Sequence, residues 1–137
     1  MKLFRYIAFS TALILSINLI AQNNYPYQYI SPKPSSIMVS HKSNIMLKQG
    51  DIIDKSTLDS RLFAVEGSKS GLHAGHLILS DDHRTIVFNP AEAFAGDEVV
   101  TVTQRVGLKT RNGDSVPEWS FEYRTAPLGI SQIHDSE

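Results

Sequence analysis

Apolar and polar residues alternate with a two-residue period in short runs along most of the chain from residue 45 onward. This alternation is typical of β-strands with one buried face. The last run, WSFEYR at residues 119–124, is the clearest. An edge strand is predicted over residues 27–31, because prolines stand on both sides of it. The positions expected in the core are Ile45, Leu47, Phe63, Val65, Leu77, Leu79, Ile86, Phe88, Val100, Val102, Trp119, Phe121 and Tyr123.

Clusters of turn-forming residues separate these runs at intervals of about a dozen positions. No helical pattern of 10 to 15 residues lies between the runs, which favours a sandwich over a βαβ arrangement. Two single helical turns are expected, at residues 55–59 after a cap at Asp54 and at residues 91–94 after Pro90. The sequence therefore predicts an all-β, immunoglobulin-like β-sandwich of about seven strands.

The N-terminus predicts a secretory signal peptide. Lys2 and Arg5 precede an apolar run at residues 7–20, and the small residue Ala21 is followed by polar residues. The run is shorter than the roughly 20 apolar residues that span a bilayer as a helix. We therefore expect a mature chain that begins at Gln22 and is secreted or held in the cell envelope; an uncleaved signal anchor is the alternative. The expected organisation is a signal peptide at 1–21, an extended lead-in at 22–28, the sandwich at 29–125 and a flexible tail or linker at 126–137.

Several segments agree in spacing with one known pattern. Residues 63–67 (FAVEG) place an aromatic residue and a valine on one face before a glycine turn. Residues 80–90 (SDDHRTIVFNP) lead from an acidic turn into a strand that ends in Phe-x-Pro, and residues 119–121 (WSF) fit a closing strand. Together they resemble the bacterial Ig-like module of the S-layer protein (SbsA-type) family over residues 29–125. The resemblance implies an Ig-like spacer that accompanies exported enzymes, adhesins or surface-layer segments. Two features depart from the family pattern: Gln49 replaces a large apolar residue at the end of the second strand, and residues 104–106 (QRV) lengthen the sixth.

Composition narrows the classes of function. The chain has 13 Lys and Arg against 14 Asp and Glu, and losing Lys2 and Arg5 with the signal takes the net charge from −1 to −3. Nucleic-acid binding requires clustered positive charge, so nucleic acid is not an expected partner. The chain contains no cysteine, which excludes disulfides, thiolate metal sites and a cysteine nucleophile. Without the signal, no remaining apolar run is long enough to span a membrane.

No residue pattern indicates catalysis, a cofactor or a metal ion. His73 and His76 form an H-x-x-H pair, but residues three apart on a strand point to opposite faces. The aspartates in predicted loops lack the spacing of a calcium-binding loop, and turn formation accounts for them. No serine lies in a G-x-S-x-G motif, and glutamates such as Glu66 and Glu98 show no spacing that defines a catalytic pair. We therefore predict a protein that is not an enzyme and holds neither cofactor nor metal ion.

Aromatic residues provide one candidate binding surface. Tyr25, Tyr27 and Tyr29 alternate near the start of the mature chain, and exposed tyrosine rings can stack on sugar rings. These three residues are the candidate ligand contacts, and packing within an edge strand is the alternative explanation. Trp119 shares its face with Phe121 and is expected in the core.

The leading hypothesis is a non-catalytic Ig-like spacer or docking module of an exported bacterial surface or secreted protein. Its expected partners are other domains of a larger exported protein, surface proteins or glycans. The alternative is a binding protein or adhesin that recognises polysaccharide or a surface protein through loops or a free sheet edge. A small secreted enzyme or metal carrier is a third hypothesis.

Overall fold

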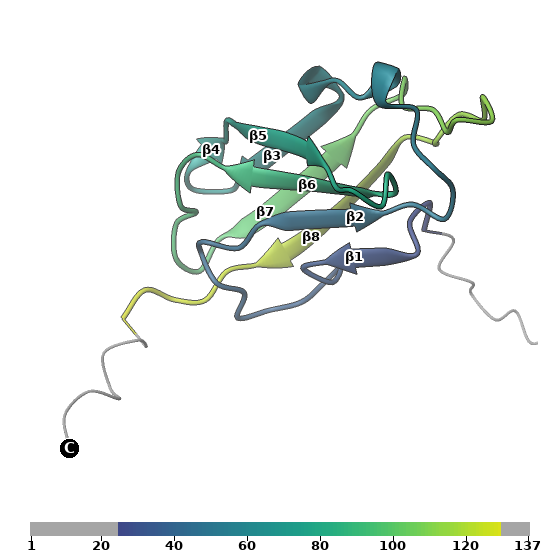
Figure 1. Ribbon diagram of the computed structural model, residues 1–137. Helices are drawn as coiled ribbons and strands as arrows, with labels where there is room; N and C mark the ends of the chain where they lie inside the picture. The colour runs from purple at the N-terminus through teal and green to yellow at the C-terminus, as the bar shows by residue number, and fades with distance from the viewer. Residues whose placement is uncertain (1–24, 130–137) are drawn as a thin grey trace, which may run out of the picture.

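The computed structural model describes residues 25–129, which form two antiparallel β-sheets packed face to face (Figure 1). One sheet has the strand order β1-β2-β6-β5 and the other the order β4-β3-β7-β8. The predicted all-β, immunoglobulin-like sandwich is confirmed. Its strands are β1 (Tyr29–Ser31), β2 (Ile45–Lys48), β3 (Phe63–Gly67), β4 (Gly71–Leu72), β5 (Gly75–Leu79), β6 (Thr85–Pro90), β7 (Val99–Gln104) and β8 (Trp119–Arg124).

The inward faces of the two sheets make one apolar core. Val102 of β7 lies opposite Val65 of β3 on one side and Phe121 of β8 on the other. In the facing sheet, Ile86 of β6 lies opposite Leu47 of β2, and all five side chains are buried. Burying one large apolar side chain contributes about 1.5–3 kcal/mol. The residues that the alternation pattern assigns to the core therefore stabilise the sandwich.

Three of the predicted core residues lie at the margin of the core. Leu77 and Leu79 of β5 and Trp119 of β8 are partly buried and pack against the fully buried residues. For the two leucines the reason is that β5 is an edge strand, so a neighbouring strand covers it on one side only.

The short helical segments differ in part from the prediction. A 3₁₀ turn, η1 (Lys55–Thr57), follows Asp54, whose carboxylate accepts a hydrogen bond from the Ser56 N–H, as expected of an N-cap. The turn predicted at residues 91–94 is wrong: this segment bends without forming a helix, and the Phe94 N–H donates to the His41 carbonyl. A second turn, η2 (Ser60–Leu62), is capped by Asp59 instead.

Strand β4 begins at the end of one of the turn-forming clusters, residues 67–71 (GSKSG). Gly67 and Gly71 pair with each other at the end of a β-hairpin. The two glycines that begin and end the turn-forming cluster therefore also belong to strands β3 and β4. Gly71 has a φ of 75°, a conformation that side chains with a Cβ rarely adopt.

The chain changes sheets after β1. The Ser35 N–H donates to the Glu122 carbonyl at 2.7 Å, and the Val39 N–H donates to the Arg124 carbonyl at 3.1 Å. Val39 also pairs with Thr125 in a parallel bridge. The segment 35–39 therefore runs along β8 and covers its outer edge.

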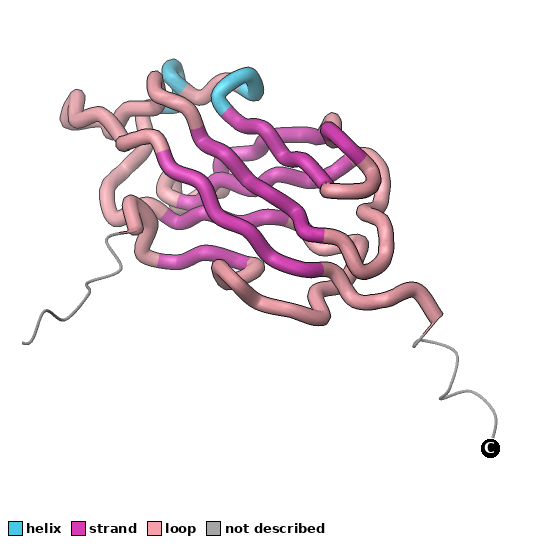
Figure 2. Tube along the Cα trace, turned by 180° about the vertical axis from the view of Figure 1, so that it is seen from behind, coloured by secondary structure: helices cyan, strands magenta, loops and turns pink. Residues whose placement is uncertain are grey.

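The described chain begins and ends at opposite ends of the sandwich. In Figure 1 it starts on the right, beside β1, and leaves on the left beyond β8. Figure 2, seen from behind, shows the same separation. The predicted signal peptide and the end of the predicted tail, from residue 130, lie outside the described residues. In the part that the structure describes, no helix has the length and apolar character needed to cross a membrane.

Candidate functional site

The three tyrosines selected from the sequence lie where the lead-in joins the edge of the sandwich. Tyr25 and Tyr29 are 41% and 51% exposed, whereas Tyr27 is 5% exposed. The backbone bends at Pro26 and Gln28, so the strict alternation needed for one common surface is lost. Tyr27 lies inside the sandwich rather than on the expected strip. A ligand contact at Tyr25 and Tyr29 stays a prediction.

An open groove of about 320 Å³ lies beside the two exposed tyrosines. It combines aromatic faces with a lysine ammonium group, a side-chain amide and a proline ring. Such a surface can stack on a flat apolar face and donate hydrogen bonds to hydroxyl or carboxylate oxygens. The lining residues are Tyr25, Tyr27, Gln28, Tyr29, Ile30, Lys33 and Pro34.

Trp119 contacts Tyr25, one of the residues that line this groove. Its ring centroid lies 5.3 Å from that of Tyr25 in an edge-to-face contact. On its other side it stacks on Phe121, with centroids 5.0 Å apart and an interplanar angle of 18°. Because Phe121 is buried, the tryptophan connects the exposed Tyr25 ring to the core. Trp119, predicted in the core, therefore lies partly buried at its margin, where it contacts the Tyr25 ring that lines the groove.

Tyr27 connects the lead-in to the opposite sheet. Its hydroxyl donates a hydrogen bond of 2.8 Å to Oε1 of Gln104, whose Nε2 donates to the Arg105 carbonyl at 2.8 Å. Burial raises the pKa of Tyr27, so the hydroxyl keeps the proton that it donates. The sequence marked Gln104 only as a departure from the family pattern. A polar residue at an inward strand position was the signal that it has a buried partner.

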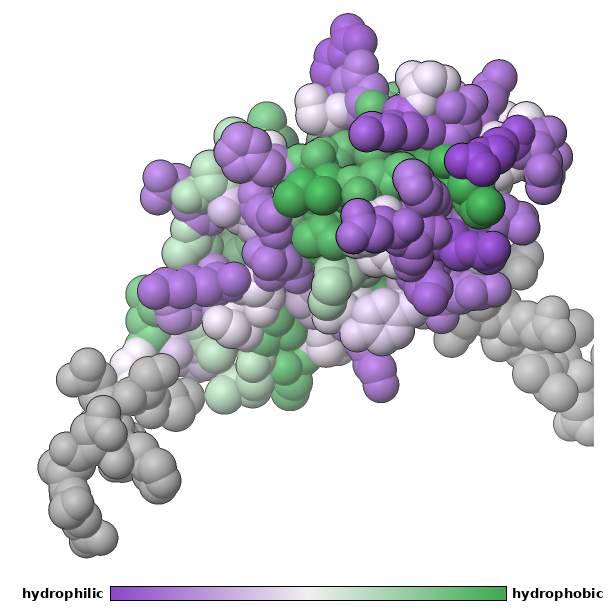
Figure 3. Space-filling view, viewed as in Figure 1, coloured by the Kyte–Doolittle hydropathy of each residue, from purple (hydrophilic) through white to green (hydrophobic). Residues whose placement is uncertain are grey.

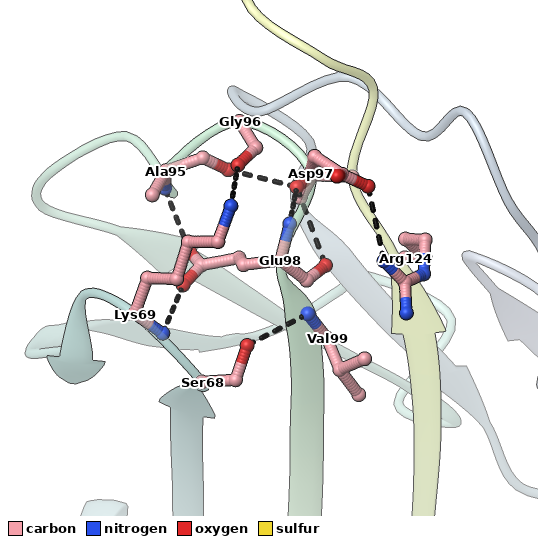
Figure 4. Close-up of polar contacts among 9 residues, drawn as sticks. Ser68, Lys69, Ala95, Gly96, Asp97, Glu98, Val99 and Arg124 are labelled. Carbon is pink, nitrogen blue, oxygen red and sulfur yellow. Dashed lines mark hydrogen bonds and ion pairs between the residues drawn. The ribbon is translucent and has the colours of Figure 1, made fainter.

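Glu98 is a buried carboxylate with four hydrogen-bond donors, and it was not distinguished from the other glutamates in the sequence. Its side chain is only 1% exposed. Oε1 accepts from the Ser70 hydroxyl and the Ala95 N–H, both at 2.7 Å, and Oε2 accepts from the N–H groups of Lys69 and Ser70, both at 2.9 Å. Figure 4 shows the carboxylate between the Lys69 and Ala95 backbones. Glu98 therefore joins the turn between β3 and β4 to the loop before β7.

These donors decide the charge of Glu98. Burial raises the pKa of the carboxyl group, but the hydrogen bonds from the Ser70 hydroxyl and from the N–H groups of Ser70, Lys69 and Ala95 lower it and prevail. The net pKa lies below the ordinary value for glutamate, so the carboxylate is ionised at neutral pH. A Cβ placed on Gly67 would lie 2.5 Å from Oε2, which explains why the turn has glycine beside the carboxylate.

Ser70 and His73 lie beside Glu98, but their arrangement differs from that of a hydrolase triad. The Ser70 hydroxyl lies 2.7 Å from both His73 Nε2 and Glu98 Oε1. An ionised carboxylate only accepts, so the single hydroxyl proton goes to Glu98 and the His73 Nε2 donates to Ser70. A nucleophilic serine instead donates its proton to the histidine. The three residues therefore stabilise the hairpin.

The remaining histidines and aspartates show no convergence on a metal ion. His73 packs against Phe94, with ring centroids 4.4 Å apart, and His76 is exposed on β5. Between residues 25 and 129, no three His, Cys, Asp or Glu side chains are placed to hold a metal ion. Asp82 accepts hydrogen bonds from the Thr85 hydroxyl and the Arg84 N–H, which lower its pKa to about 2. Turn formation thus accounts for Asp82, as predicted for the loop aspartates.

Comparisons with solved structures identify several proteins with this fold. Domains 1–6 of the surface layer protein SbsC match with a TM-score of 0.54 and 15% identity, covering 71% of this chain and 13% of that one. PcoC, a copper resistance protein from Escherichia coli, matches with a TM-score of 0.55 and 13% identity over 72% of this chain and 97% of its own. The LD transpeptidase LdtMt1 matches with a TM-score of 0.52 and 11% identity over 74% and 40%. No family model matches the sequence, and no curated protein matches it.

At these identities the likeness shows the fold alone. This chain corresponds to 13% of SbsC but to nearly all of PcoC, so the same sandwich serves as one part of a long protein and as a protein in itself. The similarity to S-layer domains agrees with the resemblance found in the sequence at the level of an S-layer-like Ig fold.

Proposed function

We propose that the protein is an exported, non-catalytic Ig-like module of the S-layer (SbsA-type) kind that acts as a spacer or docking platform in a bacterial surface or secreted protein. The observation that supports this proposal is the path of the chain. It enters at one end of the sandwich and leaves at the other (Figures 1 and 2). With Gln22 as its first residue, a domain built in this way holds its amino-terminal end a full sandwich length away from whatever follows it.

The way in which both ends are held also favours a spacer. At the start, Tyr27 is bonded to Gln104 in the opposite sheet. At the other end, the Asp97 N–H donates to the Ala126 carbonyl at 3.1 Å, and Arg124 forms an ion pair with Asp97 at 3.0 Å. Both ends of the described chain are therefore fixed to the sandwich, as a rigid spacer requires.

Export and the position of the mature amino terminus provide the test of this proposal. An antibody against residues 25–129 is used on cell fractions and culture medium of the source bacterium, and the amino terminus of the recovered protein is sequenced. We expect the protein in the envelope or the medium, with Gln22 as its first residue. Recovery from the cytoplasm with Met1 retained would contradict the export that the proposal requires.

A binding role is the second candidate, and the groove at Tyr25 and Tyr29 favours it. The ligand class would be polysaccharide, because two exposed tyrosine rings lie beside Lys33 and Gln28 in an open groove. The mature protein is tested on a glycan array together with a Tyr25→Ala/Tyr29→Ala variant. The matched control is Ile37→Ala, which removes an exposed apolar side chain elsewhere.

The two roles predict different results on the array. A polysaccharide-binding protein loses its signal in the double tyrosine variant and keeps it in the control. A spacer shows no signal that depends on Tyr25 or Tyr29. Circular dichroism of each variant establishes that the fold is intact.

A further inference from the structure

Three of the four outer strand edges of the sandwich are short or covered. The edge of β8 is covered by the segment 35–39, which donates to and accepts from its backbone. Strand β1 has three residues and is followed at once by Pro32, and β4 has two residues. Natural sheets protect their edges by these means, because an open edge pairs readily with another strand.

Strand β5 is the exception. It has five residues, pairs with β6 alone and contains neither proline nor a charged Lys, Arg, Asp or Glu residue. Beside it, the Ser80 N–H donates to the Thr85 carbonyl and the Ala91 N–H donates to the Ala74 carbonyl, each at 2.9 Å. Even-numbered residues of this segment therefore bond to β6, since antiparallel pairing alternates.

The backbone groups of the odd-numbered residues consequently point away from the sheet. These residues are Gly75, Leu77 and Leu79. In the described part of the chain, no backbone group lies on that side of β5 to form hydrogen bonds with them. They form a row of free N–H and C=O groups along one side of β5.

Apolar surface lies on both faces of this open edge. On the inner face, Leu77 and Leu79 are only partly buried. On the outer face, Ile78 is 48% exposed and lies opposite Val87 of β6. Figure 3 shows an apolar patch facing the viewer over β5 and β6. One added strand would satisfy the free backbone groups and cover apolar side chains on both faces.

We propose that the added strand is β5 of a second copy of this chain, paired antiparallel about a two-fold axis at Leu77. Leu77 then lies opposite the partner's Leu77, and Gly75 lies opposite the partner's Leu79. His76 lies opposite the partner's Ile78. The two sheets join into one continuous sheet of eight strands.

The sequence of β5 favours itself as the partner. The segment GHLIL has no Lys, Arg, Asp or Glu, so the two copies bring no such like charges together. The two-fold axis matches the smallest residue, Gly75, with the larger Leu79, so side chains on the inner face do not crowd. A two-fold interface requires one patch to complement itself, and this segment does so.

The interface is small. An edge of five residues buries less than the roughly 1,600 Å² of a standard protein interface, so the dimer is expected to be weak and to depend on concentration. It uses a surface distant from Tyr25 and Tyr29, and it requires neither the spacer nor the binding role.

Sedimentation equilibrium of the mature chain, from micromolar to millimolar concentration, tests the proposal. We expect a reversible monomer–dimer equilibrium in the unaltered chain. Ile78→Lys places a charge at the open edge, at a position where the side chain is half exposed, and should raise the dissociation constant at least about tenfold. The control Ile37→Lys, at a 70% exposed position beside the opposite edge, should leave the constant unchanged.

Cross-linking tests the register. The chain has no cysteine, so His76→Cys and Ile78→Cys each introduce a single thiol. A mixture of the two variants should form disulfide-linked dimers on mild oxidation, because the two positions face each other across the pair. Each variant alone should cross-link at least about tenfold more slowly, since identical positions lie diagonally, roughly 7–8 Å apart.

Two outcomes would overturn the proposal. A chain that stays monomeric at millimolar concentration would leave the open edge to an extended segment of a different protein. A dimer that persists in Ile78→Lys, or cross-linking that is equal in all three samples, would place the interface elsewhere. Neither outcome bears on where the protein is exported or whether the tyrosine groove binds glycans.

Discussion

Replacing Glu98 tests how much one buried carboxylate stabilises this cysteine-free sandwich. Glu98→Ala removes the acceptor of four hydrogen bonds, three of them from backbone N–H groups. A hydrogen bond to a charged group contributes about 1.5–3 kcal/mol, but Lys69 and Ser70 lie in an exposed turn where water can replace part of the loss. We therefore expect the free energy of unfolding to fall by about 3–5 kcal/mol.

Glu98→Gln separates the charge from the shape of the side chain. If the amide oxygen takes the place of Oε2, it still accepts from Lys69 and Ser70. The amide NH₂ then faces the Ala95 N–H, donor against donor, and only the Ser70 hydroxyl can adapt by accepting. The expected loss is about 1.5–3 kcal/mol. The matched control is Glu66→Gln, an exposed glutamate on β3, which should change stability by less than about 0.5 kcal/mol.

The loss should depend on pH in a defined direction. The pKa of Glu98 is lowered by folding, so the folded state binds this proton less readily than the unfolded state. The stabilisation is fully present above the ordinary glutamate pKa of about 4.3 and is lost as the pH falls through the lower folded-state value. The difference between the unaltered protein and Glu98→Gln should therefore shrink between neutral pH and pH values below about 4.

Urea denaturation, followed by circular dichroism at several pH values, measures these differences. Other carboxylates also have lowered pKa values, Asp59 and Asp82 among them, but both proteins contain them and their effect cancels in the comparison. A difference that is the same at acid and neutral pH would refute the assignment of the stabilisation to an ionised carboxylate. A loss below about 0.5 kcal/mol would refute the network itself.

Three further substitutions test the contacts around the core. Tyr27→Phe should lower the free energy of unfolding by about 1–2 kcal/mol in urea denaturation, because Gln104 Oε1 then lacks its buried donor; an unchanged midpoint would contradict the role of the bond. Gly67→Ala should cost about 1–3 kcal/mol, because the new methyl group would crowd the Glu98 carboxylate, and thermal unfolding measures it. Trp119→Ala should cost about 2–4 kcal/mol by circular dichroism, less than a fully buried ring, and a loss within about 0.5 kcal/mol would place the indole at the surface.

Most strands could be predicted because the alternation of apolar and polar residues shows which side chains face the core and which face water. In β7, each inward valine alternates with an outward threonine or valine. This two-residue period is visible in the local sequence, without knowledge of which strands pair with β7. Strand β4 was missed because two residues carry no period. The prediction that the Leu77 side chain points toward the core is correct. Its partial exposure follows from the position of β5 at the edge of the sheet, which the alternation pattern does not reveal.

The polar contacts could not be predicted in the same way. Glu98 meets Ser70 across 28 positions of sequence, and Tyr27 meets Gln104 across 77. Such contacts depend on which loops the fold brings together, and an isolated Glu or Gln in a sequence shows nothing of this. Tyr27 is buried and Tyr29 is exposed because the backbone bends at Gln28 between them. The two-residue alternation of the tyrosines does not reveal this bend.

Two of the buried polar residues that the sequence left unassigned, Glu98 and Gln104, lie at the two ends of one strand. Glu98 immediately precedes β7 and Gln104 is its last residue, so they stand roughly 20 Å apart along an extended strand. Gln104 accepts from the lead-in through Tyr27, while the Glu98 N–H donates to the Thr125 hydroxyl at 2.9 Å, just where the chain leaves the sandwich. Strand β7 therefore connects the point where the chain enters to the point where it leaves. This arrangement favours the proposed spacer, because one central strand, held by antiparallel pairing with β3 and β8, runs from one end of the sandwich to the other.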